Sequence, residues 1–197
     1  FVADFENPAT ADALMVQVTR RFGRAPDLLV NSAALFGQDQ LDNVTADDLS
    51  RHYAVNCMAP VLLAQAFVAA GKDVGAHSDR SIINILDQRL VHPHGDQLSY
   101  TLSKQALAGF TQIAARTLAP RVRVNAVAPG LTIATSDYSA DQLERLADLM
   151  PLARLPQPDQ IAQAVIYLAG ASAVTGQVVH VDSGAHMQSY SRDFMHL

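Results

Sequence analysis

Four short apolar runs alternate with long amphipathic stretches, and this alternation constrains the fold more than any other feature of the chain. The runs, which we predict to be strands, cover residues 28–30, 82–86, 122–127 and 177–181, and residues 1–3 are predicted as the stub of another. The stretches with helical spacing cover residues 8–22, 45–72, 97–119, 139–149 and 158–170. Strands that alternate with helices form βαβ units. We therefore predict an α/β fold, a doubly wound parallel sheet flanked by helices.

Composition excludes several classes of function. The formal net charge is -5 and no cluster of Lys or Arg stands out, which argues against a nucleic-acid or an anionic-membrane partner. The single cysteine, Cys57, permits no intramolecular disulfide, so a cytoplasmic location is expected. The apolar runs are shorter than the roughly 20 residues of a membrane span. His92 and His94 flank a proline without further ligands nearby, so no metal site is predicted.

Polar or turn residues follow three of the predicted strands. Asn31 comes after the first strand, Asp87 after the second, and Pro129–Gly130 after the third. The carboxyl ends of parallel strands lie along one edge of a sheet, where open α/β folds place their ligands. The sequence therefore predicts a cleft at this edge that binds a small-molecule substrate.

Tyr100 and Lys104 are four residues apart in the predicted helix 97–119, so they share one face. An ammonium near a phenol favours the phenolate and lowers the phenol pKa from about 10. We expect a tyrosine of this kind to transfer protons near neutral pH.

Five segments, taken in order, resemble the short-chain dehydrogenase/reductase family. They are Asn31-Ser-Ala-Ala34, Asn56 within its helix, the Tyr100-x-x-x-Lys104 pair, Val122 to Gly130, and Val181-Asp-Ser-Gly184. The resemblance covers nearly the whole chain. It implies a Rossmann-like fold, with residues 1–197 as a single, partial dinucleotide-binding domain.

Asp87 departs from the usual family pattern, which has a serine thirteen residues before the tyrosine. A serine hydroxyl can donate a hydrogen bond to a carbonyl oxygen, whereas an ionised carboxylate only accepts hydrogen bonds. The Asp-Tyr-Lys combination resembles the pteridine reductases and the dihydromonapterin reductase branch. That resemblance implies NAD(P)H-dependent reduction of a C=N bond in a pterin or folate.

Site roles follow from the same resemblance. Tyr100 would donate the proton with help from Asp87, Lys104 would hold the nicotinamide ribose and lower the Tyr100 pKa, and Asn56 would hold a water that links Lys104 to solvent. Expected catalytic residues are Asp87, Tyr100, Lys104 and Asn56. Expected cofactor contacts are Asp4, Phe5, Asn31, Ala33, Tyr100, Lys104, Pro129 and Gly130.

The family's Gly-x-x-x-Gly-x-Gly turn, which holds the pyrophosphate, does not occur in this sequence. We therefore expect an N-terminally truncated form that lacks the first two strands and binds dinucleotide poorly by itself. NADP is the expected cofactor, with NAD possible. Helices 45–72 and 97–119 form the subunit interface in the family, which implies a homo-oligomer, either a tetramer or a dimer.

Two other functions stay open. The first is a general carbonyl or alcohol oxidoreductase in which Asp87 has no special role. The second is a non-catalytic dinucleotide-binding fragment or pseudo-enzyme. The irregular stretch 131–157 is predicted to form a lid over the site.

Overall fold

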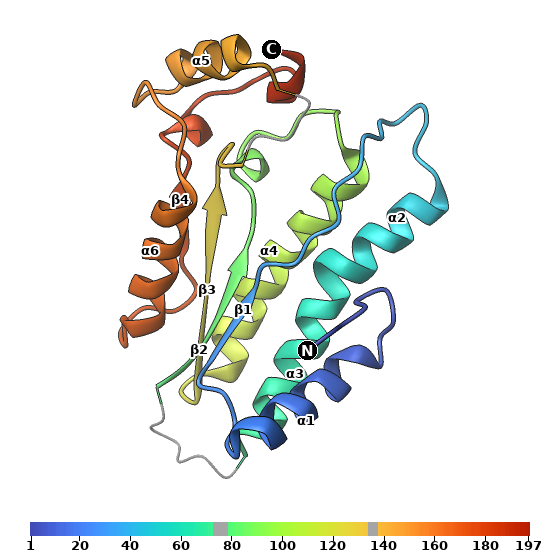
Figure 1. The fold of residues 1–197 in the computed structure, drawn as a ribbon, viewed down its shortest axis with the longest axis vertical. Helices are drawn as coiled ribbons and strands as arrows, with labels where there is room; N and C mark the ends of the chain where they lie inside the picture. Colours follow the sequence, from blue (N-terminus) through green and yellow to red (C-terminus); the bar gives the residue numbers. More distant parts are fainter. Residues whose placement is uncertain (73–78, 134–137) are drawn as a thin grey trace.

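The computed structural model describes residues 1–72, 79–133 and 138–197, and its centre is a four-stranded sheet in which every strand pair is parallel. Figure 1 shows the strands with their carboxyl ends toward α5. This architecture confirms the predicted α/β class. The strands, in their order across the sheet, are β1 (Leu28–Asn31), β2 (Arg80–Ile85), β3 (Val122–Pro129) and β4 (Val178–Val181).

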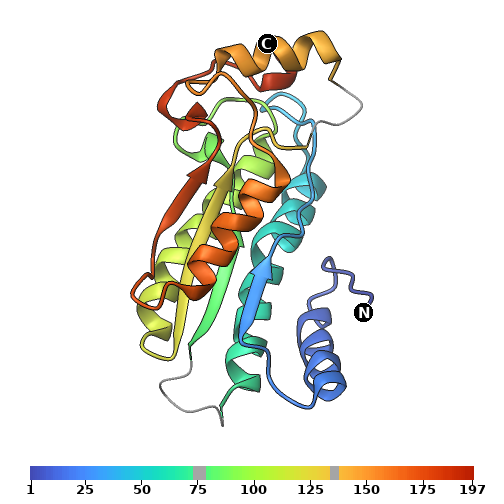
Figure 2. The same cartoon turned by 60° about the vertical axis from the view of Figure 1, so that its left-hand side comes forward.

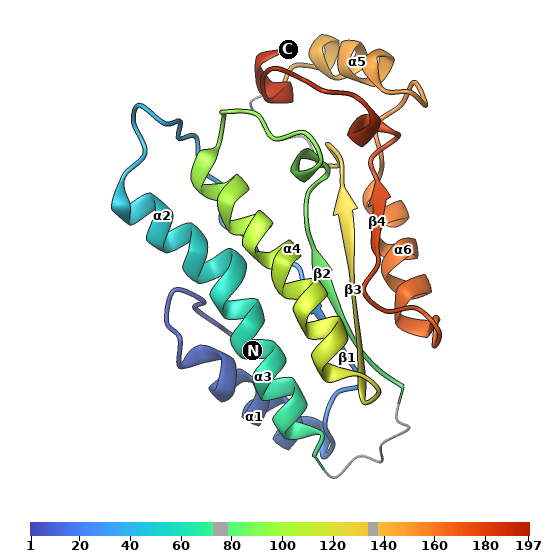
Figure 3. The same ribbon diagram turned by 180° about the vertical axis from the view of Figure 1, so that it is seen from behind.

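Apolar side chains cover both faces of the sheet, as a doubly wound fold requires. On one face Ile82 and Val124 pack against α3 and α4, which lie in front of the sheet in Figure 3. On the other face Ile83 and Val127 pack against Leu168 of α6, which lies in front of the sheet in Figure 2. The helices are α1 (Thr10–Phe22), α2 (Ala46–Tyr53), α3 (Ala59–Ala70), α4 (Leu98–Leu118), α5 (Ala140–Leu149) and α6 (Pro158–Gly170).

Element boundaries agree with the predicted ones to within two residues, because capping and turn residues mark them. The Thr45 side chain accepts from the backbone N–H of Asp48, and the Asp48 carboxylate accepts from the N–H of Thr45, which starts α2. The predicted helix 45–72 contains a π-helical segment, Ala54–Met58, between α2 and α3. Apolar periodicity alone did not predict that segment, which is a single wide turn within a longer helical stretch.

One predicted element needs correction. Residues 1–3 form no strand: they lie outside the sheet, and Val2 is 99% exposed. An extended segment without a hydrogen-bonded neighbour gains nothing from strand geometry. Among the described residues, Ala46–Ala70 is long and apolar enough to span a membrane by length and composition alone, and half of its most apolar window is buried within the protein.

A separate layer lies beyond the carboxyl ends of the strands. It combines α5 with the C-terminal tail, which we define as residues 188–197, and Leu146 and Met150 pack there against Phe194. Figure 1 shows this layer above the tips of β3 and β4. The layer closes over the sheet edge where the sequence predicts a cleft. Residues 134–137 of the predicted lid lie outside the described residues.

Candidate active site

A cavity of about 860 Å³ lies between the strand ends and the C-terminal tail. Its position at the carboxyl edge of a parallel sheet matches the predicted cleft. Its walls are mostly apolar, and its charged side chains come from the loop after β2 and from the tail. The lining includes Val30, Ser32, Ala34, Phe36, Ile85, Asp87, Arg89, Tyr100, Pro129, Gly130, Ile161, Val165, Asp193, Phe194 and Met195.

Tyr100 and Asp87 form the central contact of the site. The Tyr100 hydroxyl donates to Oδ2 of Asp87 at 2.9 Å, and Tyr100 is 7% exposed. Asp39 positions the start of α4, because its backbone oxygen accepts from the N–H of Leu98 and its carboxylate accepts from the N–H of Ser99. The first turn of α4 is thereby fixed over the end of β2.

The pKa of Tyr100 is raised well above its usual value of 10. Burial is the largest cause, and the Asp87 carboxylate adds to it, while Arg89 opposes both. The expectation that Lys104 lowers this pKa is therefore wrong for this structure. Tyr100 is held as a neutral phenol, which is the form that can donate a proton.

Lys104 lies beside Tyr100, as the four-residue spacing predicts, but its ammonium is directed at the backbone. Nζ donates to the Ile85 carbonyl at 2.7 Å and lies 5.8 Å from the centroid of the Tyr100 ring. Burial lowers the pKa of Lys104 to about 8, with Asp87 acting in the opposite direction. A buried ammonium with this pKa can exchange its proton near neutral pH.

Arg89 is a charged residue of the site that the motifs do not contain. Its side chain is buried, Nε lies 3.2 Å from Oδ1 of Asp87, and Nη2 donates to Oδ2 of Asp193 at 3.0 Å. Its backbone N–H also donates to Oδ1 of Asp87 at 2.8 Å. The sequence contained a signal for this role, because Arg89 is a second charged residue, two positions after Asp87, beyond the end of a predicted strand.

Asn56 braces the loop after β1. Its Oδ1 accepts from the Leu35 N–H at 2.7 Å, and its Nδ2 donates to the Leu35 carbonyl at 2.8 Å and to Oγ of Ser103 at 2.9 Å. Both amide hydrogens are therefore used within the protein. The side chain holds in place the loop that carries Phe36, whose ring contacts Tyr100 edge-on at 4.8 Å between centroids. The expected water link stays a prediction.

The remaining expected cofactor residues divide into three groups. Pro129 and Gly130 line the cavity. Asn31 is buried beneath it and donates to Oδ1 of Asn84 at 2.8 Å, which ties β1 to β2. Asp4, Phe5 and Ala33 are not among the cavity-lining residues. Within residues 1–72, 79–133 and 138–197, no group of three metal-ligating side chains gathers at one point.

Comparisons with known proteins agree with this geometry. The family model described as enoyl-(acyl carrier protein) reductase matches residues 1–186. The crystal structure of FolM alternative dihydrofolate reductase 1 from Brucella canis, complexed with NADP, superposes with a TM-score of 0.85 at 34% identity. That alignment covers 97% of this chain and 73% of the Brucella chain.

Two curated proteins give similar values. The uncharacterized oxidoreductase YjdA of Bacillus subtilis is 34% identical over 163 residues, which are 81% of this chain and 64% of that protein. The granaticin polyketide synthase putative ketoacyl reductase 2 of Streptomyces violaceoruber is 32% identical over 192 residues. Those residues are 94% of this chain and 76% of that protein. The chain thus spans less than two thirds of the first protein and about three quarters of the second.

Proposed function

The chain belongs to the short-chain dehydrogenase/reductase family, and on this basis we propose that it is an NADPH-dependent reductase of a C=N bond in a pterin-type substrate. The hydrogen bond from Tyr100 to Asp87 is the observation that carries the proposal. The FolM structures, which hold NADP, support both the cofactor and the substrate class. We further propose that residues 1–197 form one dinucleotide-binding domain.

The cavity fits the reactive half of the cofactor. The Lys104 ammonium has three N–H groups, one of which donates to the Ile85 carbonyl, and another would donate to a ribose. Pro129 and Gly130 line the cavity at the end of β3. When bound, NADPH supplies a hydride, and the protein supplies position and electrostatics. The sequence contains no glycine-rich turn for the pyrophosphate, so only the nicotinamide half of the cofactor is proposed to fit this cavity.

Tyr100 and Asp87 favour a nitrogen-containing substrate. The raised pKa of Tyr100 keeps a proton available for a nitrogen that gains electrons during reduction. The Asp87 carboxylate can accept a hydrogen bond from an N–H of the substrate, which a serine hydroxyl does less strongly. Phe36 is 48% exposed beside Tyr100 and offers a flat surface to an aromatic heterocycle.

Carbonyl reduction is the second candidate. The ketoacyl reductase relative favours it, and the Tyr100–Lys104 pair would serve a C=O bond as well as a C=N bond. In that case Asp87 would hinder the binding of a carbonyl oxygen, because two acceptors would face each other.

The experiment that tests the proposal is NADPH oxidation by the full-length protein with dihydrobiopterin, dihydromonapterin and dihydrofolate. We expect turnover with at least one dihydropterin, and a loss of about 100-fold or more in Tyr100→Phe, with NADPH binding retained. Clear NADPH binding without turnover of any pterin, together with turnover of a ketone, would replace this proposal by the carbonyl reductase.

A further inference from the structure

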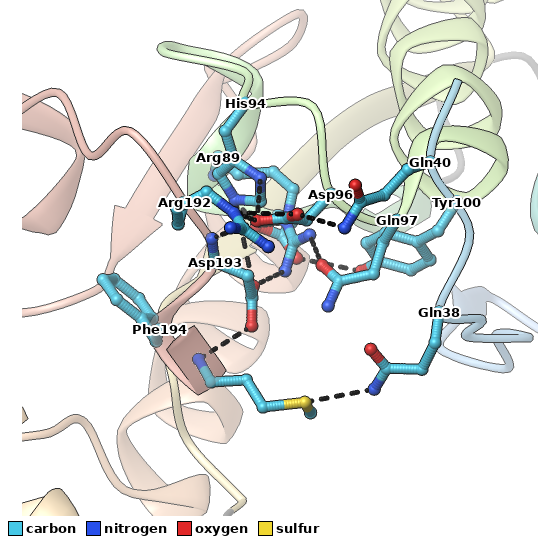
Figure 4. A network of polar contacts seen from close by, with 12 residues as sticks. Gln38, Gln40, Arg89, His94, Asp96, Gln97, Tyr100, Arg192, Asp193 and Phe194 are labelled. Atoms are coloured by element: carbon cyan, nitrogen blue, oxygen red, sulfur yellow. Dashed lines mark hydrogen bonds and ion pairs between the residues drawn. The ribbon is translucent and has the colours of Figure 1, made fainter. Parts of the chain in front are cut away.

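Arg89 is the centre of a buried charge cluster that connects the reaction site to the C-terminal tail (Figure 4). We propose that Arg89 is a positioning residue that holds the Asp87 carboxylate against Tyr100, and that Asp193 of the tail holds Arg89 in turn. The proposal rests on the proposed function in so far as Tyr100 is the proton donor. It adds to that function a requirement for the tail to be docked.

The two oxygens of Asp87 have different partners. Oδ1 accepts from the backbone N–H of Arg89 at 2.8 Å and lies 3.2 Å from Nε of the same residue. Oδ2 accepts from the Tyr100 hydroxyl at 2.9 Å. Arg89 therefore fixes the carboxylate from one side, and this leaves the second oxygen directed at the phenol. A carboxylate with a single anchor would be free to rotate away from Tyr100.

Nε of Arg89 makes its ion pair with Asp87 without a hydrogen bond, whereas the other two nitrogens of the guanidinium each donate one. Nη2 donates to Oδ2 of Asp193 at 3.0 Å, and Nη1 donates to Oε1 of Gln97. The guanidinium carbon lies 5.2 Å from the centroid of the Tyr100 ring and 5.6 Å from that of Phe36. A planar fork with several fixed donors suits this task, whereas a lysine ammonium provides a point charge.

Asp193 brings the tail into the cluster. It is 4% exposed, its Oδ1 accepts from the Met195 N–H at 3.0 Å, and its own N–H donates to Asp96 at 2.8 Å. The next two residues, Phe194 and Met195, line the cavity. Displacement of the tail would therefore both open the cavity and remove one of the two carboxylates that orient Arg89.

Charge balance makes the arrangement sensitive to loss of Arg89. Asp87 and Asp193 share this one guanidinium, and neither side chain is more than 16% exposed. Removing one partner of a buried ion pair leaves an uncompensated charge, which the surrounding groups relieve by moving. We expect the Asp87–Tyr100 geometry to be lost first, because the hydrogen bond between them depends on the orientation of Asp87.

The kinetic test compares Arg89→Met with Arg89→Lys in the full-length protein, using the dihydropterin that the wild type reduces. We expect kcat to fall about 100-fold in Arg89→Met, while KM and the Kd for NADPH stay within about threefold, since misplacement of a reacting group by about 1 Å costs that much. Arg89→Lys should recover part of the loss. Arg24→Met is the matched control, because Arg24 is exposed and pairs with Asp27 just before β1, away from the tail and from Arg89.

A second readout needs no substrate. In ¹³C-tyrosine NMR spectra, with Tyr100→Phe providing the assignment, the Tyr100 Cζ resonance should shift in Arg89→Met and in Asp193→Asn. It should stay in place in Arg24→Met. If Arg89→Met does not fold, Asp193→Asn decides, because its side chain is isosteric.

The outcomes separate the two proposals. If the wild type reduces no pterin while the Tyr100 resonance shifts in Arg89→Met and Asp193→Asn, the proposed function is contradicted and the role of Arg89 is supported. An unmoved Tyr100 resonance in Asp193→Asn and Arg89→Met would overturn the positioning role. So would a kcat loss in Arg89→Met that Arg89→Lys does not relieve at all.

Discussion

Lys104 shows how a single buried charge connects stability with chemistry. The side chain is 2% exposed, and burial lowers its pKa from 10.5 to about 8. Between these two pH values the unfolded chain binds the proton more tightly than the folded chain does. The free energy of unfolding therefore rises with pH from about 8 to about 10.5, and the cost of the buried charge is largest below pH 8.

The variant Lys104→Met should lack this pH dependence. The pKa shift corresponds to about 3 kcal/mol of unfolding free energy across the whole window. In urea unfolding, the free energy of unfolding of the wild type, relative to that of the variant, should therefore increase by up to this amount between pH 8 and 10.5. Other titrating groups are common to both proteins and cancel in the comparison. If the free energies of unfolding of the two proteins changed with pH in parallel, the lowered pKa of Lys104 would be contradicted.

Tyr100 shows what residue patterns predict and where they fail. The spacing of Tyr100 and Lys104 and the position of Asp87 at a strand end predicted that the three would meet, and they do. The direction of the Tyr100 pKa was wrong, because the sequence alone reveals neither the depth of burial nor the partner of the hydroxyl. Burial exceeds the effect of a cation several ångströms away.

At the scale of elements, the end of β3 is held close to the residues that follow β4. A Cβ placed on Gly130 would lie 2.9 Å from Cα of Asp182, a backbone atom that cannot rotate away. Gly130→Ala should therefore lower the free energy of unfolding by about 1–3 kcal/mol. The same change should weaken NADPH binding, because Gly130 lines the cavity.

Gly109→Ala is the matched control in the same protein. Gly109 lies within α4, and its added Cβ would meet nothing within 4 Å. Here the substitution should raise the free energy of unfolding by up to about 1 kcal/mol, because alanine favours the helix. Thermal unfolding of both variants is the measurement, and equal effects of the two would contradict the close approach at Gly130.

Most elements could be predicted because local signals define them, such as the Thr45 cap of α2 and Pro158 at the start of α6. The predicted strand at residues 1–3 failed because strand formation depends on a neighbour that sequence does not reveal. The π-helical turn at Asn56 follows from contacts with Leu35 and Ser103, which are distant in the chain.

At the scale of the whole molecule, the charge of the cavity predicts which substrate the proposed reductase would prefer. Among the described residues that line it, Arg89 is the only lysine or arginine, and it is already paired with Asp87 and Asp193. The glutamate carboxylates of a folate would therefore find no cation there. We expect kcat/KM for dihydromonapterin to exceed that for dihydrofolate.

Gln38 provides the means to test this selection, because it is exposed and lines the cavity. Gln38→Lys should raise kcat/KM for dihydrofolate by about threefold, as one exposed ion pair allows, and leave that for dihydromonapterin nearly unchanged. Gln38→Glu should have the opposite effect on dihydrofolate. Equal effects on both substrates would contradict the electrostatic explanation.

The tail was the part of the site that the sequence did not reveal. Asp193 and Phe194 reach the cavity from the end of the chain, and no motif marks them. Their position depends on buried polar contacts with Arg89 and Asp96, which are about 100 residues away in sequence. The family pattern covers the positions of Asp87, Tyr100 and Lys104, which the structure brings together, whereas long-range packing places the tail beside them.

The most direct test of the central claim is the exchange of Asp87 for serine in the full-length protein. Initial rates of NADPH oxidation would be measured with dihydromonapterin and with a ketone substrate. If Asp87 orients Tyr100 toward a nitrogen, Asp87→Ser should lower dihydropterin turnover about 100-fold and preserve or raise ketone turnover. Undiminished dihydropterin turnover in Asp87→Ser would contradict the account.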